Sequence, residues 1–518
     1  MMHKIESQHP YRAGCSIYTH PSQISAIATL HDVPPPSLRA PRILELGSAT
    51  GDNLLAIAAT LPESECVGVE LEADLVREAS QNVKLAKLQN LSFICGDASA
   101  CGSAAPFDRP FDFVIAHGLF SWIPKPLQLR LLDECARLLA PGGLLYLSYN
   151  CYPRWHELAP WRKLMRLHQA DRPPEYARET LSHFSQLISP EEPPPAHLKN
   201  LKVLEERLRD SPAFYLAHEY LLDENHPAYF IDVARALEQR GVGYVGDAQL
   251  GLDRLSTRLS SEEAATLDRL DGGDRLLREQ HLDLLFNVGF RRSIWRKGAT
   301  AGSLIEERIW DLELLSPYQP LSLLSERARG HHNAQLLAAS EGHWSVHAPK
   351  ALFHCLEPEQ VLEATGLMSH ALLSLLGIAW PGSYPLAQLY QDTEQLLQGE
   401  GLAPPKETRA LILRELLQLL SNELLPPPRL TPPPLTNEER PLRLSPLAMA
   451  AYLRGERRVG SGHHQFARLP ALPPQTLPQL TAGGTPAALR SLLRGSLAED
   501  EARRAFELLL EGGHLWLA

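Results

Sequence analysis

The sequence predicts an α/β protein whose first domain is a doubly wound, mainly parallel sheet. Three observations predict it: five short apolar runs alternate with helical patterns over about 110 residues, a turn of small residues follows the first run, and polar residues stand where later runs end. In such a sheet, ligands bind beyond the carboxyl ends of the strands. We therefore expect a ligand site in the first third of the chain.

The first apolar run, residues 42–46, suits a strand that is covered on both faces. It enters a turn in which Gly47, Ala49 and Gly51 allow the backbone to approach a ligand at the start of a helix. The dinucleotide pattern G-x-G-x-x-G is not met, because the turn reads E-x-G-x-A-x-G from Glu45 onward. The turn indicates a nucleotide site and leaves the nucleotide open.

The second and third apolar runs each end in an acid. Residues 65–70 end in Glu70, and a carboxylate at the tip of a second strand can accept both ribose hydroxyls. Taken alone, Glu70 could be a solvated loop acid, but the preceding strand and the amphipathic helix of residues 71–87 favour the ligand role. Residues 91–95 lead to Asp97, which could also be an ordinary helix cap.

The fourth and fifth runs complete this pattern. Residues 111–116 stop at His117, the first residue of a stretch rich in aromatic side chains. Residues 138–149 read as a helix end, a Pro-Gly-Gly turn and a fifth strand. All the polar residues singled out so far follow strand ends, where the carboxyl edge of a parallel sheet gathers them.

This order of motifs resembles that of class I S-adenosylmethionine (SAM) methyltransferases, which have a Rossmann-like sheet. That family usually has a glycine where Ala49 stands, so the turn here is narrower by one methyl group. The resemblance implies SAM as the cofactor, with Asp97 near the adenine amine. It implies the following cofactor-binding residues: Tyr18, His20, Glu45, Gly47, Ala49, Gly51, Asn53, Glu70, Leu71, Asp97, Ala98 and His117.

Two flanking segments resemble a particular subgroup of that family. The segment from Tyr18 to Pro21 precedes the sheet, and the run Y-N-C-Y-P-R-W-H follows the fifth strand. Both are similar to segments of bacterial methyltransferases with a methyltransferase regulatory domain, related to rickettsial protein-lysine methyltransferases that modify outer membrane proteins. The resemblance implies methyl transfer to lysine side chains of a protein, such as an outer-membrane or surface protein. Four residues of the second segment are the catalytic candidates: Tyr149, Tyr152, Trp155 and His156.

The rest of the chain is divided by composition and resemblance. We expect a SAM-binding core, a helical insertion, a regulatory domain, a helical and winged-helix-like domain, and a C-terminal helical domain, at residues 1–156, 157–225, 226–298, 299–440 and 441–518. The regulatory domain either completes the sheet with two more strands or forms a separate small α/β domain. Leu-rich segments near 351–376 and 406–425 read as helices, and the proline-rich run after the second is a stiff linker or a wing.

Composition excludes several classes of protein. With 518 residues and 44% hydrophobic content, the chain should form two to four domains with substantial cores. The seven cysteines lack C-x-x-C or zinc spacing, and the histidine pairs lack partner ligands, so we expect no metal site. No apolar leader and no apolar run of membrane length occur, so we expect a cytoplasmic protein without a membrane span. A net charge of −11 argues against nonspecific nucleic-acid binding.

Two alternative functions stay open at this point. A small-molecule methyltransferase would use the same SAM half with a closed pocket, and a non-catalytic SAM-binding scaffold would use its C-terminal half to bind a partner. The long helical additions are also compatible with a homodimer.

Overall fold

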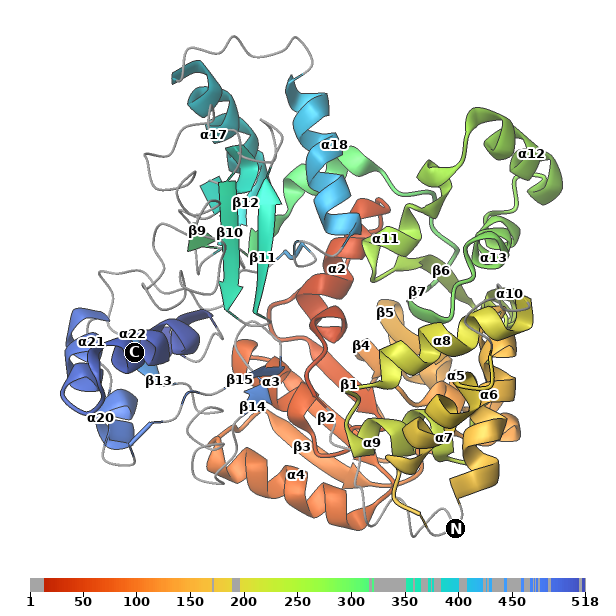
Figure 1. Cartoon of the computed structure of the whole chain (residues 1–518), viewed down its shortest axis with the longest axis horizontal. Helices are drawn as coiled ribbons and strands as arrows, with labels where there is room; N and C mark the ends of the chain where they lie inside the picture. The colour runs from red at the N-terminus through yellow and green to blue at the C-terminus, as the bar shows by residue number, and fades with distance from the viewer. Residues whose placement is uncertain are drawn as a thin grey trace.

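The computed structural model of this protein describes residues 14–169, 172–188 and 196–315 continuously. It also describes segments 319–320, 351–356, 359–364, 371–373, 375–376, 383–399, 408–422, 425, 428–430, 442–444, 458–460, 466–468, 470, 472–473, 476–482, 486–511 and 515–517. A seven-stranded sheet forms the centre of the first 300 residues (Figure 1).

The sheet has the strand order β3-β2-β1-β4-β5-β7-β6. Its strands are β1 (Arg42–Leu46), β2 (Glu65–Glu70), β3 (Leu91–Cys95), β4 (Phe111–Ala116), β5 (Leu139–Asn150), β6 (Val242–Asp247) and β7 (Phe290–Lys297). Strands β1 to β5 pair in parallel, whereas β7 is antiparallel to both β5 and β6. Residues 242–297 therefore supply two strands of the same sheet as the first 150 residues.

Helices cover both faces of the sheet, so its side chains alternate between two cores. One core joins Ile43, Ile115 and Tyr146 to α2 (Pro21–Leu30) and α3 (Asp52–Thr60). The other includes buried residues of the opposite strand faces and of α5 (Lys125–Leu138), α10 (Phe230–Glu238), α12 (Ser261–Asp271) and α13 (Arg275–Phe286). Helix α4 (Ala73–Leu85) packs beside β3 and α3. The expected doubly wound sheet is confirmed.

A helical insertion follows β5 and has a small core of its own, which includes Trp155, Trp161 and Tyr220. Its elements are α6 (Arg154–Gln169), α7 (Tyr176–Ser185), α8 (Ala196–Leu208), α9 (Ala213–Leu216) and the one-turn π-helix η3 (Ala217–Leu221). The short elements elsewhere in the first part are the 3-10 helices η1 (Ile17–Thr19), η2 (Phe120–Trp122), η4 (Leu255–Arg258) and η5 (Glu306–Asp311), and helix α11 (Leu250–Asp253).

Beyond residue 312, the described segments form short strands and helices. They are β8 (Glu313–Leu315), β9 (Gln319–Pro320), β10 (Ala351–Leu356), β11 (Glu359–Ala364), β12 (Ser383–Pro385), α17 (Leu386–Gly399), α18 (Thr408–Ser421), β13 (Leu442–Leu444), β14 (Arg458–Gly460), β15 (Phe466–Arg468), α20 (Leu477–Ala482), α21 (Pro486–Arg494), α22 (Glu499–Glu511) and β16 (Leu515–Leu517).

One expectation for this region was wrong. Residues 351–356 and 359–364 form the antiparallel pair β10 and β11 instead of a helix, whereas residues 371–373 and 375–376 at the end of the same segment are helical, as expected. The leucine content suggested a helix, but Pro358 interrupts the segment and β-branched or aromatic residues such as Phe353 and Val361 suit strands. Helix α18 lies where a helix was expected.

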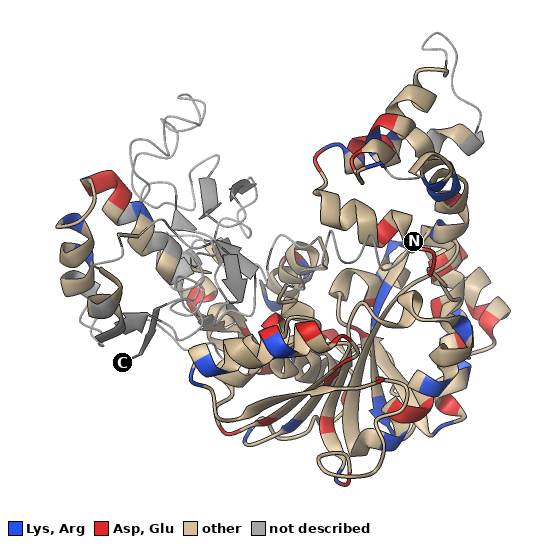
Figure 2. Cartoon of the chain, turned by 90° about the horizontal axis from the view of Figure 1, so that it is seen from below, with Lys and Arg blue, Asp and Glu red and all other residues tan. Residues whose placement is uncertain are grey.

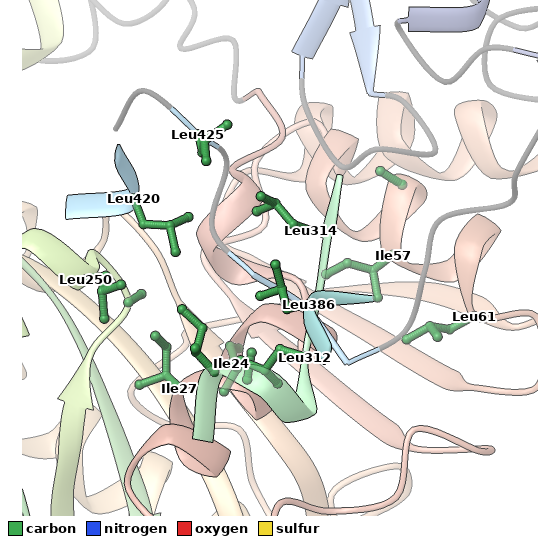
Figure 3. Packing of buried hydrophobic residues seen from close by; sticks show 14 of the residues in the cluster. Ile24, Ile27, Ile57, Leu61, Leu250, Leu312, Leu314, Leu386, Leu420 and Leu425 are labelled. Atoms are coloured by element: carbon green, nitrogen blue, oxygen red, sulfur yellow. The ribbon is translucent and has the colours of Figure 1, made fainter. Parts of the chain in front are cut away.

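Helices of the C-terminal half share the core that covers α2 and α3. Ile24, Leu250, Leu386 and Leu420 belong to one buried cluster, and Figure 3 shows them converging from different parts of the chain. At Gly251, an added Cβ would lie 2.4 Å from the carbonyl oxygen of Ser421, so α11 and α18 approach too closely for a larger side chain. The described C-terminal segments are thus packed onto the first domain.

Charged residues are mixed over the outer helices. Figure 2 shows Lys and Arg intermingled with Asp and Glu on the helices around the sheet, without a basic face in that view. Among the residues that the structure describes, no helix is long and apolar enough to cross a membrane.

A buried ion cluster fastens β7 to α13. Arg291 is 0% exposed, and its guanidinium donates to Asp283 at 2.7 Å, to Glu279 at 3.0 Å and to the Tyr244 hydroxyl at 3.1 Å. A buried charge is tolerated only when its counter-charges and hydrogen bonds are in place. The cluster therefore sets the position of β7.

We predict that Asp283→Ala destabilises the protein by about 3 kcal/mol, because it leaves the buried Arg291 guanidinium only partly compensated. Urea unfolding of both proteins measures this. Glu63→Ala, which breaks an exposed ion pair with Arg39, is the control and should cause no measurable change. Equal stability of the Asp283→Ala variant and the wild type would contradict the role of the cluster.

Candidate cofactor and acceptor site

The turn between β1 and α3 has the backbone of a ligand cradle. Gly47 and Gly51 adopt left-handed φ values of +75° and +79°, and a Cβ on Gly51 would lie 2.4 Å from the ring of Phe93. Ala49 is also left-handed, at φ 44°, which costs about 1 kcal/mol for a residue with a side chain. The N-cap Gly51 has no side chain to cap α3, and the start of a helix suits a ligand with acceptor groups.

Glu70 links this turn to the end of β2. Its Oε2 accepts from the Ala49 N–H at 2.8 Å, and its Oε1 accepts from the N–H groups of Leu71 and Glu72 at 2.8 and 3.1 Å. These bonds hold the strained Ala49 in place. They leave Oε2 with one further acceptor position, which suits one ribose hydroxyl. The side chain of Leu71 is 66% exposed beside it.

Asp97 makes a local hydrogen-bonded turn. One of its carboxylate oxygens accepts from both the N–H and the hydroxyl of Ser99 at 2.8 Å. Its other oxygen forms no hydrogen bond with a described residue. The helix cap that was weighed for Asp97 is wrong, because no helix lies between β3 and β4; the adenine role stays a prediction. Ala98 packs at the margin of the second core.

Glu45 is buried below the turn with one oxygen unpaired. Its Oε1 accepts from the Asn53 amide at 2.8 Å, whereas Oε2 has no partner, and burial raises the pKa of this carboxyl to about 8. The Asn53 oxygen in turn accepts from the Thr19 hydroxyl at 2.8 Å and the Ser16 N–H at 3.3 Å. The segment around η1 is thus tied to the cradle.

His117 extends this polar layer to the ends of β4 and β5. Its Nδ1 lies 3.0 Å from the Ser148 hydroxyl and 3.2 Å from the Tyr146 hydroxyl, and the Gly118 N–H donates to Ser148 at 2.9 Å. Burial, followed by the charge of Arg292, lowers the pKa of His117 to about 4, so the ring is neutral at neutral pH. Because side chains alternate along strands, His117 lies on the same face as Glu45.

The two residues predicted upstream of the sheet are placed differently. Tyr18 is half-buried, with the Arg292 guanidinium carbon 4.7 Å from its ring centroid. His20 is buried at the start of α2, where it accepts from the Ser22 N–H and approaches the Thr60 hydroxyl at 3.0 Å. Tyr18 therefore faces the polar layer, whereas His20 joins α2 to α3.

The four catalytic candidates divide into two pairs. Tyr149 is 1% exposed in the core against Phe120, and the buried Trp155 donates its Nε1–H to the Gly289 carbonyl at 3.0 Å. Tyr152 and His156 instead stack with ring centroids 3.8 Å apart. The structure thus brings only the second pair together outside the core.

Tyr229 completes this aromatic cluster, and our reading of the sequence did not include it. Its ring centroid lies 5.0 Å from that of Tyr152, and its hydroxyl lies 3.1 Å from the His156 Nε2. A β-bridge between Cys151 and Ala228 brings this residue to the end of β5. The N-H-P-A-Y motif at residues 225–229 was the available signal. We call Tyr152, His156 and Tyr229 the aromatic cluster.

The site residues fit SAM as a ligand. SAM carries an ammonium group and a sulfonium, and the unpaired buried oxygen of Glu45 is suited to a positively charged group. The uncapped start of α3 and the carboxylate of Glu70 supply donors and an acceptor for the nucleoside. Within the described residues, no group of three His, Cys, Asp or Glu side chains could hold a metal ion.

Two protein families match the parts of the chain that build this site. Residues 43–143 match the family described as methyltransferase domain, and residues 212–297 match the family described as predicted methyltransferase regulatory domain. The second match contains β6 and β7. The chain therefore carries a class I SAM-dependent methyltransferase domain together with a methyltransferase regulatory domain, and its strand order is typical of that class.

Among solved structures, the chain is similar in fold to PKMT2 from Rickettsia typhi in complex with AdoHcy. The TM-score is 0.78 at 18% sequence identity, over 98% of this chain and 100% of that chain.

Curated relatives match over shorter stretches. The uncharacterized protein RP789 of Rickettsia prowazekii is 28% identical over 299 residues, which are 56% of this chain and 52% of the relative. The uncharacterized protein RP028 of the same organism is 31% identical over 164 residues, 31% of this chain and 62% of the relative. The chain thus spans about half to three fifths of the length of these relatives.

The buried Glu45 predicts a pH dependence of stability. Its folded pKa of about 8 exceeds the ordinary value of 4.5, so the folded chain keeps a proton between these values that the unfolded chain loses. The free energy of unfolding should therefore fall as pH rises through this window, by at most about 1.4 kcal/mol per pH unit from this group. Glu45→Gln should remove that part of the slope in urea unfolding between pH 5 and 8.

Glu65→Gln is the control for this measurement. The Arg42 guanidinium lowers the pKa of Glu65, so the stability that Glu65 contributes is lost only as pH falls below about 4.5. Its removal should leave the slope between pH 5 and 8 unchanged. Parallel curves for the wild type and Glu45→Gln would show that Glu45 is ionised in the folded chain.

Proposed function

We propose that this protein transfers a methyl group from SAM to lysine side chains of a protein substrate. One observation carries the proposal: the cradle built from Glu45, Gly51 and Glu70 and the cluster built from Tyr152 and Tyr229 follow strands of one parallel sheet at the same edge. A cofactor site and an aromatic acceptor surface on one edge suit transfer between two bound partners. The likeness in fold to PKMT2, a protein-lysine methyltransferase, supports the lysine acceptor.

The chemistry that SAM supplies when bound is an electrophilic methyl group on a sulfonium with a neutral leaving group. The protein has little acid catalysis to perform, so its main task is to hold the acceptor amine in line with that group. In this proposal, the cradle fixes the nucleoside. The neutral His117 and the hydroxyls of Tyr146 and Ser148 line the neighbouring strand ends.

The aromatic cluster would receive the acceptor. The faces of Tyr152 and Tyr229 attract an alkyl ammonium by cation–π interaction. A lysine must lose its proton before it attacks, and a nearby positive sulfonium lowers the pKa of the ammonium. The His156 imidazole, held at 3.1 Å by the Tyr229 hydroxyl, can relay that proton to solvent because His156 is exposed.

We also propose that the enzyme acts in the cytoplasm. The described cysteines are free, which suits the reducing cytoplasm, with an outer-membrane or surface protein as the acceptor before export. In the expected winged-helix-like unit, α18 would contact protein rather than DNA, since it carries only two arginines.

We predict that Glu70→Ala weakens binding of SAM and of S-adenosylhomocysteine by about 10- to 100-fold, because a charged acceptor and the tie to Ala49 are lost. Calorimetric titration measures this. Glu72→Ala, a neighbouring acid whose side chain caps nothing, is the matched control and should bind like the wild type. Failure of the wild type to bind either ligand would refute the methyltransferase proposal.

We further predict that Tyr152→Phe lowers methyl transfer about tenfold or more and leaves affinity for S-adenosylhomocysteine unchanged, because in this proposal the Tyr152 hydroxyl shares the proton relay with the stacked His156. The assay follows radiolabelled methyl transfer to bacterial envelope proteins, with mass spectrometry of the methylated residue. Tyr176→Phe on α7 is the control. Equal loss of turnover and affinity would show that Tyr152 is structural, and a methylated residue other than lysine would correct the acceptor.

A further inference from the structure

Arg292 brings a positive charge from the regulatory domain to the ligand edge of the sheet. It lies on β7 opposite Ser148 of β5, near the carboxyl end of β5. Ile294, two residues away on β7, belongs to the core that covers α2 and α3, so Arg292 points to the same sheet face as Glu45 and His117. The pKa of His117 responds to its charge.

The Arg292 side chain is held from several sides. Its guanidinium carbon lies 4.7 Å from the ring centroid of Tyr18 and 5.1 Å from that of Phe290. Its Nη1 donates to the Gln249 side-chain oxygen at 2.7 Å, and its backbone N–H donates to Asp247 at 3.1 Å. The side chain is therefore positioned before any ligand binds.

The remaining side-chain donors of Arg292 have no partner among the described residues. Its Nε is buried without a hydrogen bond, and Nη2 bonds to no described residue. No carboxylate among the described residues forms an ion pair with Arg292; the Asp247 carboxylate reaches only its backbone. Nε and Nη2 form the fork that binds a carboxylate with two parallel hydrogen bonds. A half-buried guanidinium with this fork unpaired lacks, within the described part of the chain, the ion pair that would repay its desolvation.

Glu45 holds its carboxyl on the same face, where a bound ammonium would favour loss of the proton that burial keeps on it. Its unpaired Oε2 lies below the η1 segment to which Tyr18 belongs. The backbones of β1 and β7 are three strand spacings apart, about 14 Å, with β4 and β5 between them. An α-amino acid group, with its ammonium and carboxylate, matches this pair of charges.

We infer that Arg292 binds a carboxylate at the methyl-transfer site through its Nε and Nη2 fork. The inference rests on the proposed function and extends it. The strand that completes the ligand site, β7, belongs to the regulatory domain, so residues 43–143 alone would not bind this carboxylate. The carboxylate is either that of the methionine end of SAM or one carried by the protein acceptor. Both present the same chemistry to the fork.

The test compares two ligands and three variants of the full chain. S-adenosylhomocysteine carries the carboxylate, whereas its decarboxylated analogue S-adenosyl-3-thiopropylamine keeps the amine alone. Both are titrated calorimetrically into the wild type, Arg292→Gln, Arg292→Lys and Arg296→Gln. Arg296 is the matched control, because it is on the same face of β7 with a buried, unpartnered Nε but lies opposite Leu144, far from the ligand edge. Melting temperatures report folding.

If the carboxylate belongs to SAM, Arg292→Gln weakens S-adenosylhomocysteine binding by about 10- to 100-fold, leaves the analogue unaffected and abolishes the preference for the carboxylate. If it belongs to the acceptor, both affinities stay constant and the KM for the methylated protein rises by a similar factor with kcat retained. Arg292→Lys keeps the charge without the fork, so its affinity or KM should change less than that of Arg292→Gln in either case. If Arg292→Gln has a lowered melting temperature, Arg292→Lys takes its place in the comparison.

Other outcomes overturn the inference. Wild-type behaviour of Arg292→Gln toward both ligands and the acceptor would show that the fork binds no carboxylate. Equal weakening of both ligands, or the same loss in Arg296→Gln, would show a structural effect. Absence of S-adenosylhomocysteine binding to the wild type itself would refute the proposed function together with the inference, which separates it from a failure of Arg292 alone.

Discussion

The antiparallel strand β7 is the constraint on which the rest of the structure depends. It pairs with β5 along residues 144–150 and with β6 on its other side. Successive side chains of a strand point to opposite faces, so Arg291 enters the acidic cluster on α13 while Arg292 reaches the face of η1. Without β7, strand β5 would be an open edge at the acceptor side of the site. The regulatory domain is therefore part of the sheet that carries the candidate site.

Most of this sheet could be predicted because buried parallel strands are continuous apolar runs and their ends carry the turn residues and acids. The burial of Arg291 could not be predicted, because its counter-charges, Glu279 and Asp283, belong to another element, α13. The strand pair β10 and β11 was missed because leucine content suits a helix and a strand equally well, and only pairing decides between them.

The candidate site shows the same limit at the level of single residues. Tyr149 and Tyr152 are three residues apart, but the first belongs to an alternating strand and enters the core. Tyr152, in the turn just before α6, meets His156 in the first turn of that helix. Tyr229 and Arg292 join the site through pairing between distant segments, which a single sequence does not encode locally. Motif order thus predicts the cofactor half better than the acceptor half.

The core shared by α2, α3 and the C-terminal helices determines which substitutions affect the cofactor cradle. Helix α3 starts at the cofactor cradle, and buried residues of α17 and α18 pack in the same cluster as those of α3. Interiors of proteins are close-packed and transmit strain when a side chain is lost. A genetic screen for weakened cofactor binding would therefore recover substitutions of buried leucines in α17 and α18 as well as substitutions in the cradle. Mutations in the C-terminal half are therefore expected to affect ligand binding in the first half.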